Sequence, residues 1–315
     1  MILTVTLNAA LDRTLAVPNF SVGHQQRATD SLLLPGGKGV NVARALKRLG
    51  VPVIATGLAG GRTGTALTEE LTAEGILNDF VRIQGESRTS TAVVEPTVNV
   101  QTEINEHGPE VTPGELETFF EKLHYLSKGT SLVVLAGSLP RGVEPDLYAD
   151  IVRRLGAMGR PTVIDAPGEP LHLALAAEPE LVSPNVREAE DVVGYEFSDE
   201  ADFASAALAL TQMGAQNAII HSHDGCIARL RDENGEIVTL RARFNEPIDV
   251  VSTVGSGDAF LAGFLSEWGH GQPVERALRT AVACGMANTR VIGAGVFDIG
   301  DVEAFARQVE VTRVT

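Results

Sequence analysis

The feature that most constrains the fold is a regular alternation of two hydrophobic patterns along most of the chain. Short apolar runs, typical of buried strands, are separated by stretches in which apolar residues recur at the spacing of an amphipathic helix. One helix has a clear start, since Thr112, Pro113 and Glu115 have the spacing of an N-cap, a first-turn proline and a capping-box glutamate. The alternation predicts an α/β fold in which helices pack on a mainly parallel sheet.

Two segments interrupt this alternation, at about residues 13–35 and 87–107. Both contain β-like pieces without a helical period, so we predict that they form a small second sheet over the mouth of the ligand site. Because this lid would be inserted in one large α/β unit, we expect residues 1–315 to form a single domain. A hydrophobic share of 44% with only 5% aromatic residues favours a core of small aliphatic side chains, as in helices packed on a parallel sheet.

The chain is strongly acidic, with a formal net charge of −16. Nucleic acids and anionic membranes bind basic surfaces, so we expect neither as a partner. No apolar run is long enough to span a bilayer, and Met1-Ile2-Leu3-Thr4 lacks the charged start of a secretion signal. These features predict a cytoplasmic protein that binds any anionic ligand through a few basic side chains and backbone amides.

A glycine-rich turn near the C-terminus carries the strongest chemical signal. Gly255-Ser256-Gly257-Asp258 is followed by apolar residues at helical spacing, so its amides would lie at the positive end of a helix dipole. Unpaired amides can stabilise charge on a phosphoryl group in transfer, and Asp258 can accept a proton from an attacking hydroxyl. The segment therefore predicts an anion-binding turn beside a general base.

A second glycine-rich segment, Pro35-Gly36-Gly37-Lys38-Gly39-Val40-Asn41, also begins a predicted helix. Its glycines would let the backbone approach a ligand closely, with Lys38 and Asn41 in or near the first helical turn. The chain lacks both the P-loop pattern and the G-x-S-x-G elbow of many hydrolases. A third turn, Gly60-Gly61-Arg62-Thr63-Gly64, leaves a dinucleotide-dependent oxidoreductase as an alternative, although its glycine spacing departs from the usual fingerprint.

Four motifs together resemble those of the PfkB carbohydrate kinase family, which has the ribokinase-like fold. They are Gly36-Gly37-Lys38-Gly39-Val40-Asn41, Gly137-Ser138-Leu139-Pro140-Arg141-Gly142, Asn185-Val186-Arg187-Glu188 and Gly255-Ser256-Gly257-Asp258. The resemblance implies a three-layer α/β/α sandwich with a small β-sheet lid, and a homodimer formed through that lid. It also implies transfer of the γ-phosphate of ATP, with Mg²⁺, to a sugar hydroxyl.

The same resemblance assigns roles at the nucleotide end of the site. Asp258 matches the catalytic base, and the amides of Gly255, Ser256 and Gly257 match the anion hole, where Gly257 also contacts the nucleotide. Asn185 and Glu188 match an element that organises Mg²⁺ partly through water, as this slowly dehydrating ion favours, and Asn185 also faces the nucleotide. Further nucleotide contacts are implied for Ser222, Gly225 and Asn288.

At the sugar end, the chain resembles the branch of the family that phosphorylates hexose phosphates. Cations for the existing phosphate would come from Lys38, Arg88 and Arg27, and in relatives a residue placed like Arg27 reaches a neighbouring subunit's site. The residues implied to hold the sugar itself are Asp12, Gly37, Asn41 and Ser138. The expected reaction converts fructose 1-phosphate to fructose 1,6-bisphosphate. Tagatose 6-phosphate and fructose 6-phosphate are alternative substrates, and a non-catalytic sugar-phosphate sensor is a further alternative.

Overall fold

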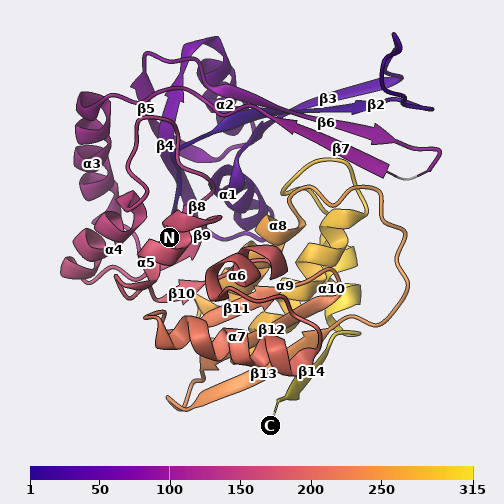
Figure 1. Cartoon of the computed structure of the whole chain (residues 1–315). Helices are drawn as coiled ribbons and strands as arrows, with labels where there is room; N and C mark the ends of the chain where they lie inside the picture. Colours follow the sequence, from indigo (N-terminus) through magenta and orange to yellow (C-terminus); the bar gives the residue numbers. More distant parts are fainter. Residues whose placement is uncertain (99, 315) are drawn as a thin grey trace.

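The computed structural model describes residues 1–98 and 100–314, in which the strands form a large and a small sheet (Figure 1). In spatial order, the ten-stranded sheet consists of β14 (Glu310–Arg313), β13 (Ile237–Arg243), β12 (Gly225–Arg231), β11 (Ala218–His221), β10 (Leu181–Val182), β9 (Thr162–Asp165), β8 (Leu132–Ala136), β1 (Ile2–Thr6), β4 (Val53–Gly60) and β5 (Leu77–Ile83). Pairing is parallel from β11 to β5 and antiparallel from β11 to β14. The predicted mainly parallel sheet is confirmed.

Helices cover both faces of this sheet (Figure 1). One face packs against α1 (Lys38–Arg48), α2 (Gly61–Ala73), α8 (Ser256–Trp268), α9 (Val274–Thr289) and α10 (Ile299–Ala306). The other packs against α3 (Pro113–Ser127), α4 (Leu147–Ala157), α5 (Glu169–Leu175), α6 (Val186–Val193) and α7 (Glu200–Gln212). The central strand β1 serves both cores, since Ile2 points to the first face and Leu3 and Val5 point to the second. No helix in the described part of the chain has the length and apolar character that a membrane crossing requires.

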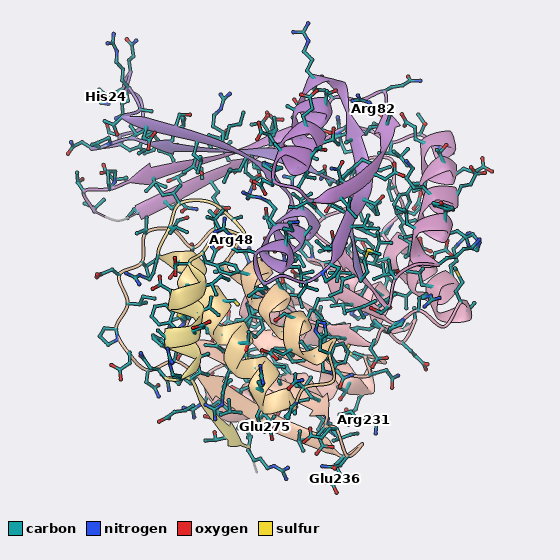
Figure 2. The ribbon with its side chains drawn as sticks, turned by 180° about the vertical axis from the view of Figure 1, so that it is seen from behind. His24, Arg48, Arg82, Arg231, Glu236 and Glu275 are labelled. Carbon is teal, nitrogen blue, oxygen red and sulfur yellow. The ribbon has the colours of Figure 1, made fainter. Side chains whose placement is uncertain are left out.

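The small sheet lies to one side of the large one. Its strands, in spatial order, are β3 (Asp30–Gly36), β2 (Ala10–Ala16), β6 (Arg88–Glu95) and β7 (Val100–Asn105). Seen from behind, this sheet projects away from the body, with His24 at its outer end, while Glu236 marks the opposite end of the molecule (Figure 2). The structure therefore contains the separate small sheet that the sequence predicts, and we call it the lid.

Three helices begin near the carboxyl ends of the parallel strands, the edge where open α/β sheets bind ligands. α1 follows Gly37, which has a φ of 97°, and α8 follows Gly255, which has a φ of 75°. Residues with a side chain rarely adopt such positive φ values, so a glycine is suited to the turn that precedes each of these two helices. α6 begins with a capping box in which Asn185 and Glu188 each accept the other's backbone N–H. The fold thus brings three polar helix starts to one edge of the sheet.

Candidate active site

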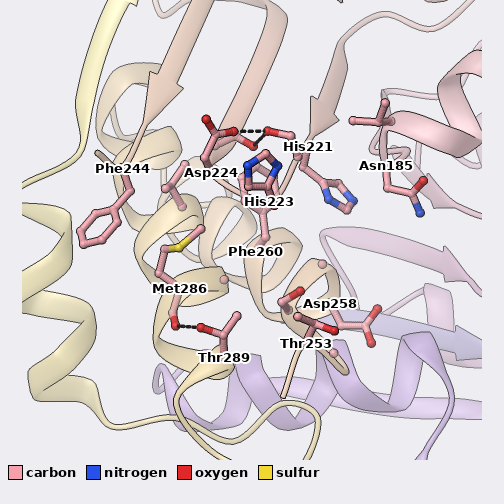
Figure 3. Close-up of a pocket in the computed structure, with 18 of the residues that line it drawn as sticks. Asn185, His221, His223, Asp224, Phe244, Thr253, Asp258, Phe260, Met286 and Thr289 are labelled. Carbon is pink, nitrogen blue, oxygen red and sulfur yellow. Dashed lines mark hydrogen bonds between the residues drawn. The ribbon is translucent and has the colours of Figure 1, made fainter. Parts of the chain in front are cut away.

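Two cavities meet at this edge, and Lys38 lines both. The large cavity, of about 730 Å³, has apolar residues such as Phe244 and Met286 at one end and Asp258 at the other (Figure 3). The lid cavity, of about 450 Å³, lies under the lid and includes Arg88. The size of each is that of a small-molecule site. The arrangement can therefore hold two ligands side by side, with Lys38 between them.

The turn that begins α8 forms one wall of the large cavity. The amides of Gly255 and Gly257 have no hydrogen-bond partner in the described part of the chain, whereas the Ser256 amide donates to Thr253 O at 3.2 Å. A Cβ on Gly257 would lie only 2.9 Å from the His221 ring. Two of the three predicted amides are thus free to bind an anion, and the Ser256 amide instead stabilises the turn.

Asp258 is buried in the first turn of α8, with 5% of its surface exposed. Its Oδ2 accepts a hydrogen bond from Asn41 Nδ2 on α1, at 2.8 Å. Burial raises the pKa of Asp258 to about 7, with a further increase from Asp165, while Lys38 and the Asn41 hydrogen bond oppose the rise. A carboxyl group with this pKa can accept a proton near neutral pH.

Lys38 donates to two carboxylates that come from distant parts of the sequence. Its Nζ lies 2.7 Å from Asp165 Oδ1, at the end of β9, and 2.9 Å from Glu188 Oε1 on α6. Burial alone would lower the pKa of Lys38, but Asp165, Glu188 and Asp258 raise it above its ordinary value. Lys38 is therefore a fixed cation where the two cavities meet. Asp165 is not among the site residues predicted from the sequence, although its place at the carboxyl end of a predicted strand is a usable signal.

The opposite wall of the large cavity comes from the start of α6 and the end of β11. Asn185 and His221 lie on the same side of the cavity (Figure 3). Burial lowers the pKa of His221 to about 4, so its imidazole is neutral at physiological pH. Ser222 and Gly225 also line the cavity, and Ser222 Oγ donates to Asp224 Oδ1 at 2.8 Å. Among residues 1–98 and 100–314, no group of three or more His, Cys, Asp or Glu is arranged to hold a metal ion.

The lid contributes Asp12 and Arg88. Burial raises the pKa of Asp12 to about 6, against the opposing effect of Arg88 and Arg44. Arg88 Nε donates to Asn8 O at 3.1 Å, and Asn8 Nδ2 in turn donates to Ser138 Oγ at the same distance. A polar chain therefore joins the lid to the end of β1 and to the loop after β8.

Residues 6–298 match the profile of the pfkB family carbohydrate kinases. The chain belongs to this family. A 1-phosphofructokinase of Borreliella burgdorferi is 33% identical to it over 91% of each chain. A tagatose-6-phosphate kinase of Staphylococcus epidermidis is 33% identical over the full length of both chains.

Solved structures agree with the family assignment. A possible 1-phosphofructokinase of Thermotoga maritima is 29% identical over 100% of both chains, with a TM-score of 0.91. A ribokinase of Arabidopsis thaliana, 19% identical over 97% of this chain and 98% of its own, has the same fold with a TM-score of 0.75. The pfkB family and the ribokinase-like fold inferred from the four motifs are both confirmed.

Six residues predicted from the pfkB resemblance are not among those that line the large cavity or the lid cavity: Asp12, Arg27, Gly37, Asn41, Glu188 and Asn288. Of these, Asn41 and Glu188 contact the lining residues Asp258 and Lys38. Asn288 is fully buried and is not among the residues lining the large cavity. Its Nδ2 donates to Val254 O at 2.8 Å and its Oδ1 accepts from Val296 N at 3.3 Å, so it supports the turn before Gly255. Arg27 is exposed and lines none of the cavities described here.

The glycine turn that suggested a dinucleotide site is occupied by the chain's own carboxylate. Glu86 Oε1 accepts a hydrogen bond from Thr63 N at 2.6 Å, in the first turn of α2. A Cβ on Gly61 would overlap the same carboxylate, so the turn packs tightly around it. A bound pyrophosphate would have to displace Glu86, which argues against the oxidoreductase alternative.

Proposed function

We propose that this pfkB-family chain transfers the γ-phosphate of ATP to a hexose phosphate, with fructose 1-phosphate as substrate and fructose 1,6-bisphosphate as product. One observation carries the proposal: Asp258 and the free amides of Gly255 and Gly257 line the large cavity near Lys38, which also lines the lid cavity. Phosphoryl transfer needs little more from a protein than positioning and charge stabilisation around the group in transfer. Similarity to a 1-phosphofructokinase and to a tagatose-6-phosphate kinase supports the same class of substrate.

In this proposal Asp258 Oδ1 accepts the proton of the attacking hydroxyl. Asn41 holds Oδ2 through its hydrogen bond, which leaves the other carboxylate oxygen for the substrate. General-base catalysis of this kind typically contributes about 10²- to 10⁴-fold. The amides of Gly255 and Gly257 would stabilise the charge on the transferring group, as donors in an anion hole do.

Lys38 takes a different role from the one that the resemblance implied. Its ammonium is held by Asp165 and Glu188 and lines both cavities. We therefore assign it to the phosphoryl group in transfer rather than to the phosphate already on the sugar. We assign the phosphate already on the sugar to Arg88, which lines the lid cavity and a neighbouring outer cavity. Asp12, Gly37 and Ser138 remain the candidates for contacts with the sugar.

Mg²⁺ fits this site through water rather than through a full set of protein ligands. The Asn185 and Glu188 side chains cap α6, and Glu188 also accepts from Lys38. Their oxygens, and those of Asp165, keep lone pairs that can accept hydrogen bonds from metal-bound water. Mg²⁺ retains several waters in such sites and neutralises charge on nucleotide phosphates.

The outer face of the lid supports a homodimer. Ile104, Thr91, Arg13 and Leu33 pair across the four lid strands and so lie on one face. Ile104 is 61% exposed and Leu33 is 46% exposed. Two lids packed through this face would cover the Ile104 and Leu33 side chains. In such a dimer Arg27 could reach the partner's site. Sedimentation velocity should give a dimer for the wild type and a monomer for Ile104→Glu; a monomeric wild type would contradict the assignment.

The proposed reaction is tested by following ADP release with Mg²⁺ and ATP. Fructose 1-phosphate, fructose 6-phosphate, tagatose 6-phosphate and unphosphorylated fructose are compared by kcat/KM. We expect the highest value with fructose 1-phosphate and the lowest with fructose. Arg88→Gln should raise KM for the phosphorylated sugars while leaving the weak activity on fructose unchanged. Release of ADP only with an unphosphorylated sugar, or with none of the four, would refute the proposal.

A further inference from the structure

We propose that Arg187, on the first turn of α6, binds the phosphates of the nucleotide that are not transferred. This inference rests on the proposed function, because it assumes a nucleoside triphosphate in the large cavity. It concerns a position that the family motif leaves open, between Asn185 and Glu188.

The charges around the large cavity motivate the proposal. Its lining includes the carboxylates of Asp165, Asp224, Glu246 and Asp258. The two lining residues with a permanent cation are Lys38, whose ammonium is shared by two carboxylates, and Arg187. A nucleoside triphosphate bound there would bring several further negative charges. Such a ligand needs a cation that is not already committed to the protein.

Arg187 meets that requirement. Its side chain forms no hydrogen bond or ion pair with any residue in 1–98 or 100–314, and it is exposed on the wall of the cavity. Arg243, by contrast, is paired with Asp224, with 2.8 Å between Nε and Oδ2. An unpaired guanidinium keeps its planar set of N–H donors available, and this geometry suits phosphate oxygens.

The backbone around Arg187 supports the same ligand. The Asn185 and Glu188 amides are used by the capping box of α6. The amides of Val186 and Arg187 have no partner in the described part of the chain, and both residues line the cavity. A helix start with free amides stabilises a nearby anion. The large cavity therefore has two groups of anion donors, one at the start of α8 and one at the start of α6.

The two groups of donors would bind different phosphates of the triphosphate. The α8 turn is next to Asp258, so it receives the phosphoryl group that moves. The α6 start, with Arg187, then receives the phosphates that remain with the nucleotide. Because contacts to these phosphates are present both before and during transfer, losing Arg187 should raise KM for ATP more than it lowers kcat.

The test is calorimetric titration of the whole protein with adenosine, ADP and ATP, in Mg²⁺ and without sugar. Four proteins are compared: wild type, Arg187→Gln, Arg187→Lys and the control Arg153→Gln. Arg153 is also an exposed helical arginine without a partner in the described residues, and it lies outside the large cavity. We expect Arg187→Gln to weaken ADP and ATP binding by roughly tenfold, as loss of one charge-assisted contact would, with adenosine unchanged. The affinity of Arg187→Lys for ADP and ATP should lie between those of the wild type and Arg187→Gln, and the affinity of the control Arg153→Gln should match that of the wild type.

The possible failures are distinct. Wild-type affinity of Arg187→Gln for ADP and ATP would overturn this inference and leave the proposed function standing. Equal weakening of adenosine and ADP would also overturn it, because the loss would then not depend on phosphate. If the wild type bound neither ADP nor ATP, the proposed function would fall and this inference with it. Thermal unfolding of each variant checks that the exposed substitutions leave the fold intact.

Discussion

The hydrogen bond from Asn41 to Asp258 makes the pH dependence of the reaction a quantitative prediction. Asn41→Ala removes the donor, which lies 2.8 Å from Asp258 Oδ2. The other end of the Asn41 amide, Oδ1, has no hydrogen-bond partner among the residues that the structure describes, so the substitution breaks no second side-chain hydrogen bond there. The change therefore acts mainly on the carboxylate.

The size of the effect follows from the charge of the acceptor. A hydrogen bond to an ionised group contributes about 1.5 kcal/mol or somewhat more, and one pKa unit corresponds to about 1.4 kcal/mol. Since the bond favours the ionised form, its loss should raise the pKa of Asp258 by about one unit, from about 7. At pH 7 the ionised fraction would fall from about a half to about a tenth, so activity should fall roughly fivefold there. At pH 9 most of it should return.

The assay is kcat/KM for the sugar phosphate between pH 5 and pH 10, which reports groups of the free enzyme. Titration of the substrates themselves cancels when variant and wild type are compared. Asn105→Ala is the matched control, because Asn105 lines the lid cavity and makes no contact with Asp258. The acid limb should move to higher pH in Asn41→Ala alone. An acid limb at the wild-type position, with activity reduced equally at every pH, would refute the reasoning.

Three further predictions concern the same site. Lys38→Met should lower the free energy of unfolding in urea by roughly 2–3 kcal/mol, which is below the usual cost of breaking a buried ion pair because the Lys38 side chain is 30% exposed. An unchanged urea midpoint of unfolding would contradict a stabilising role for these ion pairs. Gly255→Ala should lower the melting temperature more than Gly159→Ala, because both glycines have a positive φ but only a Cβ at position 255 would overlap another residue, Ala294. Equal decreases in melting temperature would argue against the overlap. Asp258→Asn should be more stable than the wild type at pH 8, because a carboxyl with a raised pKa in the folded state makes the wild type lose stability as pH rises from about 4 to about 7. A difference in melting temperature between the two proteins that stays the same at every pH would contradict this.

Much of the architecture was predictable from local pattern. The capping box at Thr112 and Glu115 is present, because its residues lie within one turn and depend little on the rest of the chain. The start of α8 at Ser256, just after Gly255, follows from the same kind of local signal. The order of strands and helices predicted the mainly parallel sheet for a similar reason.

The pairing of side chains across the site was not predictable in the same way. Lys38 contacts Asp165, which is 127 positions away in the sequence, and Asn41 contacts Asp258, which is 217 positions away. Such contacts depend on how α1 lies relative to the end of β9 and to α8, which no local spacing encodes. The hydrogen bond from Asn288 to Val254 O was not predictable for the same reason, since it is visible only in three dimensions.

In the proposed reaction, the Asp258 carboxylate accepts the proton of the sugar hydroxyl during phosphoryl transfer. The most direct test of this role is single-turnover transfer from ATP in wild type and in Asp258→Asn, with both substrates saturating. We expect a rate lower by about 10²- to 10⁴-fold in the variant, with near-normal binding of sugar phosphate and ATP. A variant that transfers phosphate within about tenfold of the wild-type rate would contradict a role for Asp258 as the general base.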